Sequence, residues 1–590
     1  VPAAMAERIG REFAQNAEDS GGRSMIIMGA GTNHWFHSDT IYRTFLTLTT
    51  LCGTQGVNGG GWAHYVGQEK CRPVTGWAQL AFGLDWSRPP RQMIGTAFWY
   101  VQTDQWRYDR LGADLLASPL GEGRFVGKSM IDTIAQSARS GWMPSYPQFN
   151  RSSLDLVGEA EAKGQAPADY VTEQLKSGDL RFAIEDPDAE ENWPRILTVW
   201  RANLLGSSSK GNEYFLRHLL GTSNAVRAEE APEDERPQGV TWRDEAPEGK
   251  LDLLVSIDFR MTSTGLFGDI LLPAATWYEK HDLSTTDMHP YVHAFTPAID
   301  PPWETRSDYD IFQDLGRAVS MLAPGHLGAV KDLVAVPLLH DTPDEMAVPG
   351  GVVRDWKTGE VDLIPGVTAP KFVVVERDYT TIGAKMSALG PLTASAGMLT
   401  KGVPFSPVEE VEMLASKNGV IPDGFAAGRP SLVTDIHACE TILALSGTTN
   451  GRLSVQGFRA MEKRTGMPLA DLAIEEEGKR ITFPDTQARP VPVITSPEWS
   501  GSEHGGRRYT AFCINVERLK PWHTLTGRQH FFLDHDWMTE LGEGLPTFRP
   551  PLNLHRLDGD QRTGAGMEVT VRYLTPHSKW SIHSEYQDNL

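Results

Sequence analysis

The stretch that decides the fold is SMIIMGAGTNHWFHSD, residues Ser24–Asp39 of the 590-residue chain. Its apolar run, Met25–Met28, breaks at Gly29-Ala30-Gly31. A strand that ends in glycines brings backbone N–H groups close to a bound phosphate. The alternative interpretation is a tight turn that only joins a strand to a helix.

Polar side chains follow these glycines at once, namely Asn33, His34, His37 and Asp39. A helical segment and a second glycine run, Gly59–Gly61, come next. The polar cluster and the second run together favour a loop that faces a ligand. The two histidines could also suggest a metal pair, but no carboxylate stands at the usual spacing, so a structured polar loop is preferred.

Further along, apolar runs alternate with helical patterns. Strands are expected over Arg195–Trp200, Leu251–Asp258 and Asp269–Trp277, and a helix is expected to begin near Ser307. Such alternation predicts an α/β fold in which helices cover a parallel sheet. From Tyr509 onward, short β-type runs and turns suggest the start of a β-barrel.

Composition limits the classes of function. The chain is long enough for several domains. It carries 55 Lys and Arg against 76 Asp and Glu, for a net charge of −21, which argues against a general nucleic-acid surface. A local basic funnel could still take an anionic substrate. The four cysteines contain no CxxC pair, so a disulfide framework, a zinc ribbon or an iron–sulfur site within this chain is not expected.

The strand ends carry the candidate binding residues. Asp258 closes an apolar strand at the edge of the sheet where ligands bind, and its carboxylate could accept two hydrogen bonds from a guanine or a ribose. Thr262 follows it with a further donor. Arg201 and Asn203 begin a second polar loop that suits phosphate and base contacts. The plainer alternatives are a solvated carboxylate or helix cap and an ordinary connection.

The sequence ends in LTPHSKWSIHS, where His577 and His583 stand on either side of Lys579. Imidazoles in this arrangement could hydrogen-bond a heterocyclic cofactor and relay protons near neutral pH, or they could be ordinary loop residues. The chain has no Walker loop, GxSxG elbow or HExxH motif, so nucleophilic and zinc-hydrolase mechanisms lack support.

Longer blocks give a more specific indication. GRSMIIMGAGTNHWFHSD, GGGWAHYVGQEKCRP, SSKGNEYFLRHLLGT, DILLPAATWYEKHDLSTTDMHP, NVERLKPWHTLTGRQHF and LTPHSKWSIHS occur in this order along the whole chain. They closely resemble the catalytic alpha subunits of membrane-bound respiratory nitrate reductases, which belong to the molybdopterin-dinucleotide oxidoreductases.

The resemblance implies a molybdenum ion held by two molybdopterin guanine dinucleotides. These would lie between two doubly wound domains, with helical insertions, and a later barrel. Residues bordering one dinucleotide would be Gly29, Gly31, Asn33 and His34, and those bordering the other would be Arg201, Asn203, Asp258 and Thr262. Residues approaching the pterins would be Gly527, Arg528, His577 and His583.

The resemblance also shows what this chain lacks. The family's histidine and cysteine ligands to a [4Fe–4S] cluster, its molybdenum-ligating aspartate and the end of its barrel are absent. We therefore expect an internal fragment that is inactive by itself, and no catalytic residue is assigned within it.

The intact subunit would reduce nitrate to nitrite by oxygen-atom transfer. Electrons would come from quinol through an iron–sulfur beta subunit and a membrane cytochrome b gamma subunit, at the cytoplasmic face of the membrane. Alternatives are a related chlorate, perchlorate or selenate reductase and, from other classes, a nicotinamide-dependent dehydrogenase or a non-catalytic scaffold. The dehydrogenase would need a third glycine where His34 stands.

The expected domain organisation has five segments. They are a part of the first doubly wound domain (1–110), a mostly helical insertion (111–190), a part of the second doubly wound domain (191–330), a mixed connecting region (331–505) and a truncated barrel (506–590).

Overall fold

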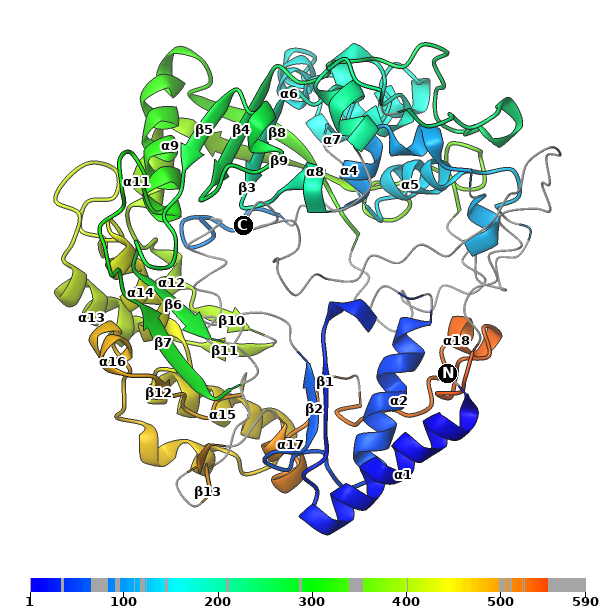
Figure 1. Ribbon diagram of the computed structural model, residues 1–590. Coiled ribbons are helices and arrows are strands. Elements are labelled where there is room, and N and C mark those ends of the chain that lie inside the picture. The colour runs from blue at the N-terminus through cyan, green and yellow to red at the C-terminus, as the bar shows by residue number, and fades with distance from the viewer. Residues whose placement is uncertain are drawn as a thin grey trace.

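A computed structural model describes residues 2–549, except 33–34, 36, 65–82, 91–95, 111, 117–122, 124, 144–146, 208–211, 226, 286–288, 339–353, 401, 498–502, 505–506, 509–511, 523 and 525. Figure 1 shows the described elements in groups around a central region. The N-terminal helices lie at the lower right, and a mainly helical group lies at the left. The parallel sheet of β3 (Ile196–Trp200), β4 (Leu253–Asp258) and β5 (Ile270–Pro273) lies at the top.

The N-terminal group is a strand–helix–strand unit. It consists of α1 (Ala3–Ser20), β1 (Met25–Met28), α2 (Ser38–Leu51) and β2 (Gly61–His64). Strands β1 and β2 pair in parallel, as a crossover helix requires. Helix α2 begins at Ser38, and its N-cap residue is His37.

The second glycine run has a packing role in this unit. A Cβ added at Gly60 would lie 2.0 Å from the backbone oxygen of Gly22, so only glycine lets the two chains approach this closely. The turn before β2 therefore needs glycine whether or not a ligand is present.

The next group joins helices to a distant hairpin. It contains α4 (Thr96–Gln102), α5 (Met130–Arg139), α6 (Ser153–Ala162), α7 (Pro167–Ser177) and the antiparallel strands β8 (Ala329–Val336) and β9 (Lys371–Asp378). Its core residues Ile131, Leu156, Phe182 and Leu333 are at most 2% exposed. The helical insertion thus shares one core with the strands β8 and β9, which lie much later along the chain. The predicted domain boundaries remain predictions.

The second parallel sheet matches the sequence-based expectation. Its elements are β3 (Ile196–Trp200), α8 (Leu204–Ser207), β4 (Leu253–Asp258), β5 (Ile270–Pro273) and α9 (Asp308–Leu322), with strand order β3-β4-β5. Both strand pairs are parallel. Phe215, from a π-helical turn at Tyr214–Leu219, packs with Leu254, and Ile311 of α9 packs with Ile257. Helices therefore cover both faces, and the predicted α/β fold is confirmed.

The remaining elements form the mainly helical group and the C-terminal segment. They are β6 (Asp282–Thr285), β7 (Tyr291–Phe295), α11 (Ile382–Met386), α12 (Leu392–Ser395), β10 (Met398–Thr400), β11 (Val403–Phe405), α13 (Val408–Asn418), α14 (Asp435–Leu445), α15 (Gly451–Thr465), α16 (Phe483–Ala488), β12 (Val491–Pro492), β13 (Glu503–His504), β14 (Arg507–Arg508), α17 (Cys513–Glu517) and α18 (Asp536–Glu540). The described part of 506–590 contains β14 and two short helices, and most of the predicted barrel start lies outside the described residues.

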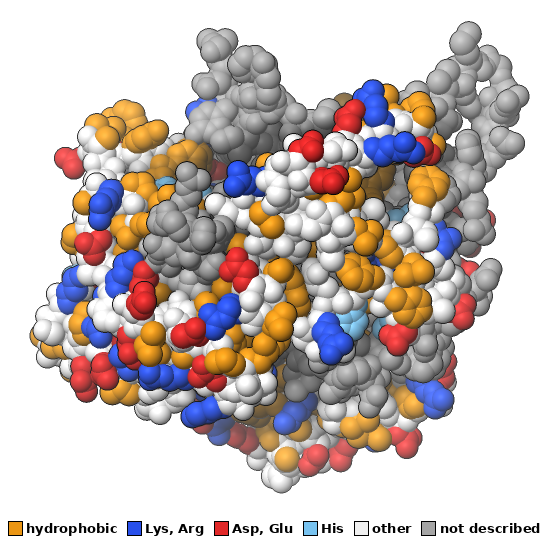
Figure 2. All heavy atoms as spheres, turned by 90° about the horizontal axis from the view of Figure 1, so that it is seen from below, with side chains coloured by type: hydrophobic (Ala, Val, Ile, Leu, Met, Phe, Trp, Pro, Cys, Tyr) orange, Lys and Arg blue, Asp and Glu red, His pale blue; other side chains and the backbone are white. Residues whose placement is uncertain are grey.

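Two surface properties bear on partners. In the part of the chain that the structure describes, we find no helix with the length and apolarity to cross a bilayer. The face drawn in Figure 2 mixes basic, acidic and hydrophobic side chains, and the coloured atoms form no continuous basic patch there. That face lacks the electrostatic footprint of a nucleic-acid surface.

A buried ionic network lies beneath the second sheet. Lys250, three residues before the start of β4 at Leu253, is fully buried. Its Nζ lies 2.9 Å from Asp104 Oδ1 and 3.0 Å from Asp188 Oδ1. Arg107 Nη1 donates to Asp188 Oδ2 at 2.9 Å. Burial raises the pKa of Asp104 well above its ordinary value, against the opposing charge of Lys250. The network joins three segments that are far apart in sequence.

Replacing Lys250 tests how much this network contributes. The substitution Lys250→Met keeps the aliphatic stem but leaves two buried carboxylates with less compensation, and breaking a buried pair costs about 3–5 kcal/mol. We expect a loss of this size in the free energy of unfolding, measured by urea titration with tryptophan fluorescence. Lys331→Ala is the matched control, because Lys331 pairs with Glu161 at the exposed surface. Equal effects of the two substitutions would contradict this assignment.

His218 makes stability depend on pH. Burial lowers its pKa to about 4, although a hydrogen bond to the Pro247 carbonyl opposes the shift. Since the unfolded chain then binds more protons between pH 6.5 and 4, stability should fall as pH falls through this window, by on the order of 3 kcal/mol. Unfolding titrations at several pH values should show this slope, and His218→Gln should lose it. An unchanged slope in the variant would exclude His218 as its source.

Candidate functional site

The predicted polar residues after β3 and β4 meet at one edge of the sheet. Parallel pairing places both carboxyl ends on the same side, so the loops that carry Arg201 and Asn203 lie beside those that carry Asp258 and Thr262. A direct bond joins the two loops, since Asn203 Oδ1 accepts the Thr264 hydroxyl at 3.0 Å. This edge is the best-described part of the candidate site.

Asp258 has an unusual environment for a carboxylate. Its side chain is 8% exposed, and Oδ1 accepts the Phe259 backbone N–H at 2.7 Å. Its Oδ2 is buried and has no hydrogen-bond partner within the described residues. Burial raises the pKa of this carboxyl, although the backbone N–H groups of Phe259 and Arg260 and the charge of Arg201 oppose the shift. A buried acceptor without a donor is costly, so this oxygen is suited to N–H or O–H groups of a ligand.

Arg201 is bound within the protein. Its guanidinium donates to both oxygens of Asp308 at 2.7 Å and to the Ala275 carbonyl at 2.7 Å. Burial disfavours ionisation of Asp308, but the hydrogen bonds from Arg201 and Trp200 outweigh it and lower the pKa to about 2. The Arg201 guanidinium therefore also links the start of α9 to the end of β3.

The backbone of Arg201 is strained. Its φ is 49°, in the left-handed region that favours glycine. Non-glycine residues hold such conformations at a cost of about 1–3 kcal/mol, most often at ligand sites. Here the Arg201 N–H bonds to the Ile257 carbonyl at 2.9 Å and maintains the turn.

Asn203 and Thr262 hold the loops in shape. Asn203 is 4% exposed, and its Oδ1 also accepts the N–H of Gly206 at 3.2 Å. Thr262 Oγ1 accepts the N–H of Gly265 at 3.0 Å. Both side chains therefore shape the loops from within.

The glycine loop lies at the end of the other parallel sheet. Gly29 and Gly31 follow β1, and among the described residues a Cβ added at either would meet no atom within 4 Å. The backbone there is open to close approach by a ligand. Asn33 and His34 lie outside the described residues.

His37 is bound by a carboxylate that the sequence did not single out. Its Nδ1 contacts Glu543 Oε1, and the described residues form no cluster of three or more metal-ligating side chains. The metal-pair alternative for the two histidines gains no support there.

Arg528 lines a surface hollow of about 440 Å³ together with Thr526, Gln529 and His530, and Gly527 lies next to it in sequence. Ligand pockets commonly have such volumes. Gln529 lies 3.5 Å from Thr50 in the last turn of α2, whereas Gly29 and Gly31 precede the first turn. The structure therefore does not bring these two glycine-containing segments together. His577 and His583 lie outside the described residues.

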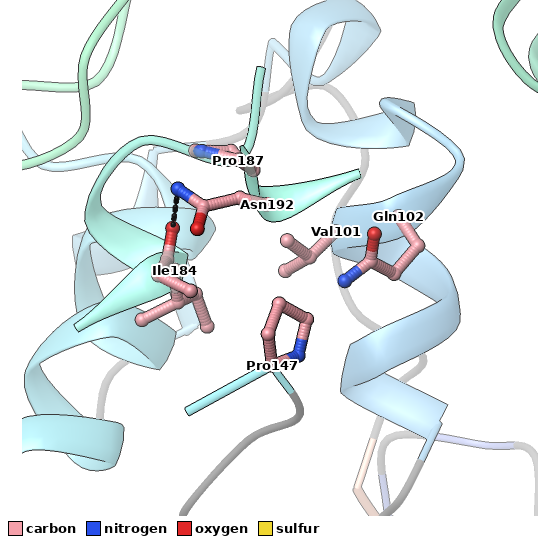
Figure 3. A pocket seen from close by; sticks show the side chains of 7 residues that line it. Val101, Gln102, Pro147, Ile184, Pro187 and Asn192 are labelled. Carbon is pink, nitrogen blue, oxygen red and sulfur yellow. Dashed lines mark hydrogen bonds between the residues drawn. The ribbon is translucent and has the colours of Figure 1, made fainter. Parts of the chain in front are cut away.

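A second cavity is too small to hold a nucleotide. It has a volume of about 10 Å³ between Val101, Pro147, Ile184 and Asn192, and Figure 3 shows these side chains around it. Asn192 donates to the Ala183 carbonyl at 3.3 Å. The space suits about one water molecule.

Sequence reasoning missed Asp308 and Glu543. Asp308 follows the N-cap Ser307, and acidic residues are common in the first helical turn, so its sequence context gives no sign of the bond to Arg201. Glu543 contacts residues about 500 positions away, and no local pattern encodes such a pairing.

Removing the Asn203 amide should loosen the site locally. Asn203→Ala would leave the Gly206 and Thr264 N–H groups without this acceptor, at a cost of about 1–3 kcal/mol for buried groups. We expect faster hydrogen exchange at these two amides. Ser263→Ala is the control, because exposed Ser263 only accepts from Asn203 Nδ2. Unchanged exchange in Asn203→Ala would show that other contacts hold the loops.

Comparison with known proteins extends these observations. The chain is 61% identical to the nitrate reductase alpha subunit of Mycobacterium tuberculosis (strain CDC 1551 / Oshkosh), over 100% of this chain and 48% of the relative. It is 52% identical to the nitrate reductase alpha chain of Bacillus subtilis (strain 168), over 99% and 48%. It is 25% identical to the perchlorate reductase subunit alpha of Dechloromonas aromatica (strain RCB), over 100% and 41%. The chain thus spans about half the length of the nitrate reductase relatives.

Two family models match in separate regions. One is described as nitrate reductase alpha chain, domain V, and matches residues 396–517. The other is described as molybdopterin oxidoreductase and matches residues 2–318, more than half of the chain, including both parallel sheets and the polar edge at Asp258. The chain belongs to the molybdopterin oxidoreductase family.

Proposed function

We propose that this chain is part of a nitrate reductase alpha subunit and borders a molybdopterin guanine dinucleotide cofactor. The observation that carries the proposal is the buried Asp258 carboxylate at the carboxyl edge of the sheet, whose Oδ2 accepts no hydrogen bond from the residues that the structure describes. Support for the substrate comes from nitrate reductase relatives that are 61% and 52% identical over nearly the whole chain.

The residues present suit such a group. A guanine base presents two N–H donors on one edge, and a strand-end carboxylate can accept both. Asp258 offers one unused oxygen in a buried position for this purpose. Strained Arg201 and the bonded pair Asn203 and Thr264 would keep the surrounding loops in place.

The other candidate residues have different parts in this proposal. Backbone groups at Gly29 and Gly31 would border the second dinucleotide together with Asn33 and His34. Arg528 would approach the pterin from the hollow that it lines, and His577 and His583 would approach it from the C-terminal segment.

The chemistry itself belongs to the cofactor. When bound, the bis(molybdopterin guanine dinucleotide) molybdenum group supplies the two-electron oxygen-atom transfer that converts nitrate into nitrite. The residues of this chain bind and orient the group. In the proposed whole enzyme, electrons come from quinol through a [4Fe–4S] cluster and the beta and gamma subunits, at the cytoplasmic face of the membrane.

A perchlorate reductase is the second candidate, because a perchlorate reductase alpha subunit aligns with the entire chain. The identity to this perchlorate reductase subunit is 25%, whereas the identity to the nitrate reductase alpha subunit is 61%, and this difference favours nitrate as the substrate. Relative rates of the complete enzyme with nitrate, chlorate, perchlorate and selenate would separate the two.

The first test uses the complete subunit with its partners. We expect nitrate-dependent oxidation of reduced viologen in preparations from molybdate-grown cells and its loss in those from tungstate-grown cells. Bound molybdenum without nitrate activity would keep the family and overturn the substrate.

Substitution of Asp258 tests the binding role directly. Asp258→Ala in the complete subunit should weaken retention of the guanine dinucleotide about 10- to 150-fold, which corresponds to about 1.5–3 kcal/mol for hydrogen bonds to a charged group. The measurement is the guanine nucleotide released by acid hydrolysis per subunit after dilution and gel filtration. Asp252→Asn is the control, because Asp252 is exposed near the other end of the same strand and pairs with Arg195. Full retention in Asp258→Ala would remove Asp258 from the site.

A further inference from the structure

Glu543 lies at the centre of a buried contact between the two ends of the described chain. Its side chain is 3% exposed, and its two oxygens contact His37 Nδ1 and Thr40 Oγ1, the latter at 2.9 Å. Arg43, which is 7% exposed, donates to the backbone carbonyl of Glu543 and, at 2.9 Å, to that of Gly544. We call the four side chains of His37, Thr40, Arg43 and Glu543 the Glu543 clamp.

On one side, the clamp fixes the first turn of α2. His37 is the N-cap residue of this helix, and its side chain makes no capping bond to the helix backbone. Its ring instead contacts the carboxylate, which also accepts from Thr40 one turn later. A carboxylate at a helix N-terminus is favoured by the helix dipole. The clamp therefore fixes the point at which the chain enters α2 after the Gly29–Gly31 segment.

On the other side, the clamp fixes the C-terminal segment. Glu543 follows α18, and the Gly544 carbonyl also accepts the Leu533 N–H at 2.9 Å. Through Leu533, the clamp is connected to the part of the chain that carries Gly527 and Arg528. Gln529 contacts Thr50 at the opposite end of α2, so this segment meets the helix at both ends.

We propose that Glu543 is a positioning residue that fixes the N-terminal end of α2 and thereby the Gly29–Gly31 loop for the cofactor. This inference rests on the proposed function, since it assigns the Gly29–Gly31 loop to the bound cofactor. Glu543 acts through His37 and Thr40 and does not touch the reacting atoms. Its effect should therefore appear in how long the cofactor stays bound.

The test uses the complete alpha subunit in its complex. Removal of an outer partner that orients a binding group commonly costs about 10- to 100-fold in affinity. We expect Glu543→Ala to release the guanine dinucleotide about 10- to 100-fold faster than the wild type, measured well below the melting temperature of the variant. Glu543→Gln keeps one acceptor oxygen and should restore part of the retention. Glu540→Ala is the matched control, because Glu540 is exposed at the end of α18, three residues before Glu543.

A milder variant keeps the test decisive if Glu543→Ala does not fold. Thr40→Val preserves the side-chain shape and removes one donor to the carboxylate. Faster release in Thr40→Val with an unchanged melting temperature supports the clamp. Wild-type retention in Thr40→Val and Glu543→Gln, or equal losses in Glu540→Ala, overturns it.

Failure of this inference can be told apart from failure of the proposed function. A wild-type complex without guanine dinucleotide would overturn the function. Normal retention in Glu543→Ala would overturn only the positioning role. Hydrogen exchange of the α2 first-turn amides in cofactor-free subunit gives a readout independent of loading: faster exchange in Glu543→Ala supports the clamp, and wild-type exchange contradicts it.

Discussion

Parallel pairing of β3 with β4 is the constraint on which the candidate site depends. It places the carboxyl ends of both strands at one edge, so two loops 60 residues apart can share hydrogen bonds. Parallel strands also need crossover connections and cover on both faces. The π-helical turn containing Phe215 and helix α9 provide this cover, and Asp308 at the start of α9 then anchors Arg201. The strained turn after β3 is thus held from two sides.

Long-range polar contacts complete this architecture. Lys250 joins Asp104 to Asp188, and Glu543 joins the C-terminal segment to α2. Charges in such buried places are costly unless they are paired, so each contact holds its partners in one arrangement. Asp258 differs from them, because one of its oxygens has no donor within the described residues. Asp258 is therefore suited to binding a ligand, whereas Lys250 and Glu543 hold parts of the fold together.

Local patterns were enough to predict several elements. The apolar runs that end at Met28, Trp200 and Asp258 are strands, and Ser307 caps α9 as its position before an amphipathic run suggests. At the start of α2, by contrast, the N-cap residue His37 makes no capping bond, and its ring contacts Glu543 from the distant C-terminal segment. The predicted barrel start and the roles of His577 and His583 stay predictions, since most of those residues lie outside the described chain.

By itself, the sequence determined the alternation of strands and helices, the polar residues at strand ends and the resemblance to a cofactor-binding family. These depend on local periodicity and on contiguous motifs. Only the tertiary structure decided that Arg201 binds Asp308, that Asp258 keeps a buried oxygen without a donor among the described residues, and that Glu543 contacts α2. Such facts depend on which distant side chains meet in a low-dielectric interior, and no local spacing along the chain specifies that.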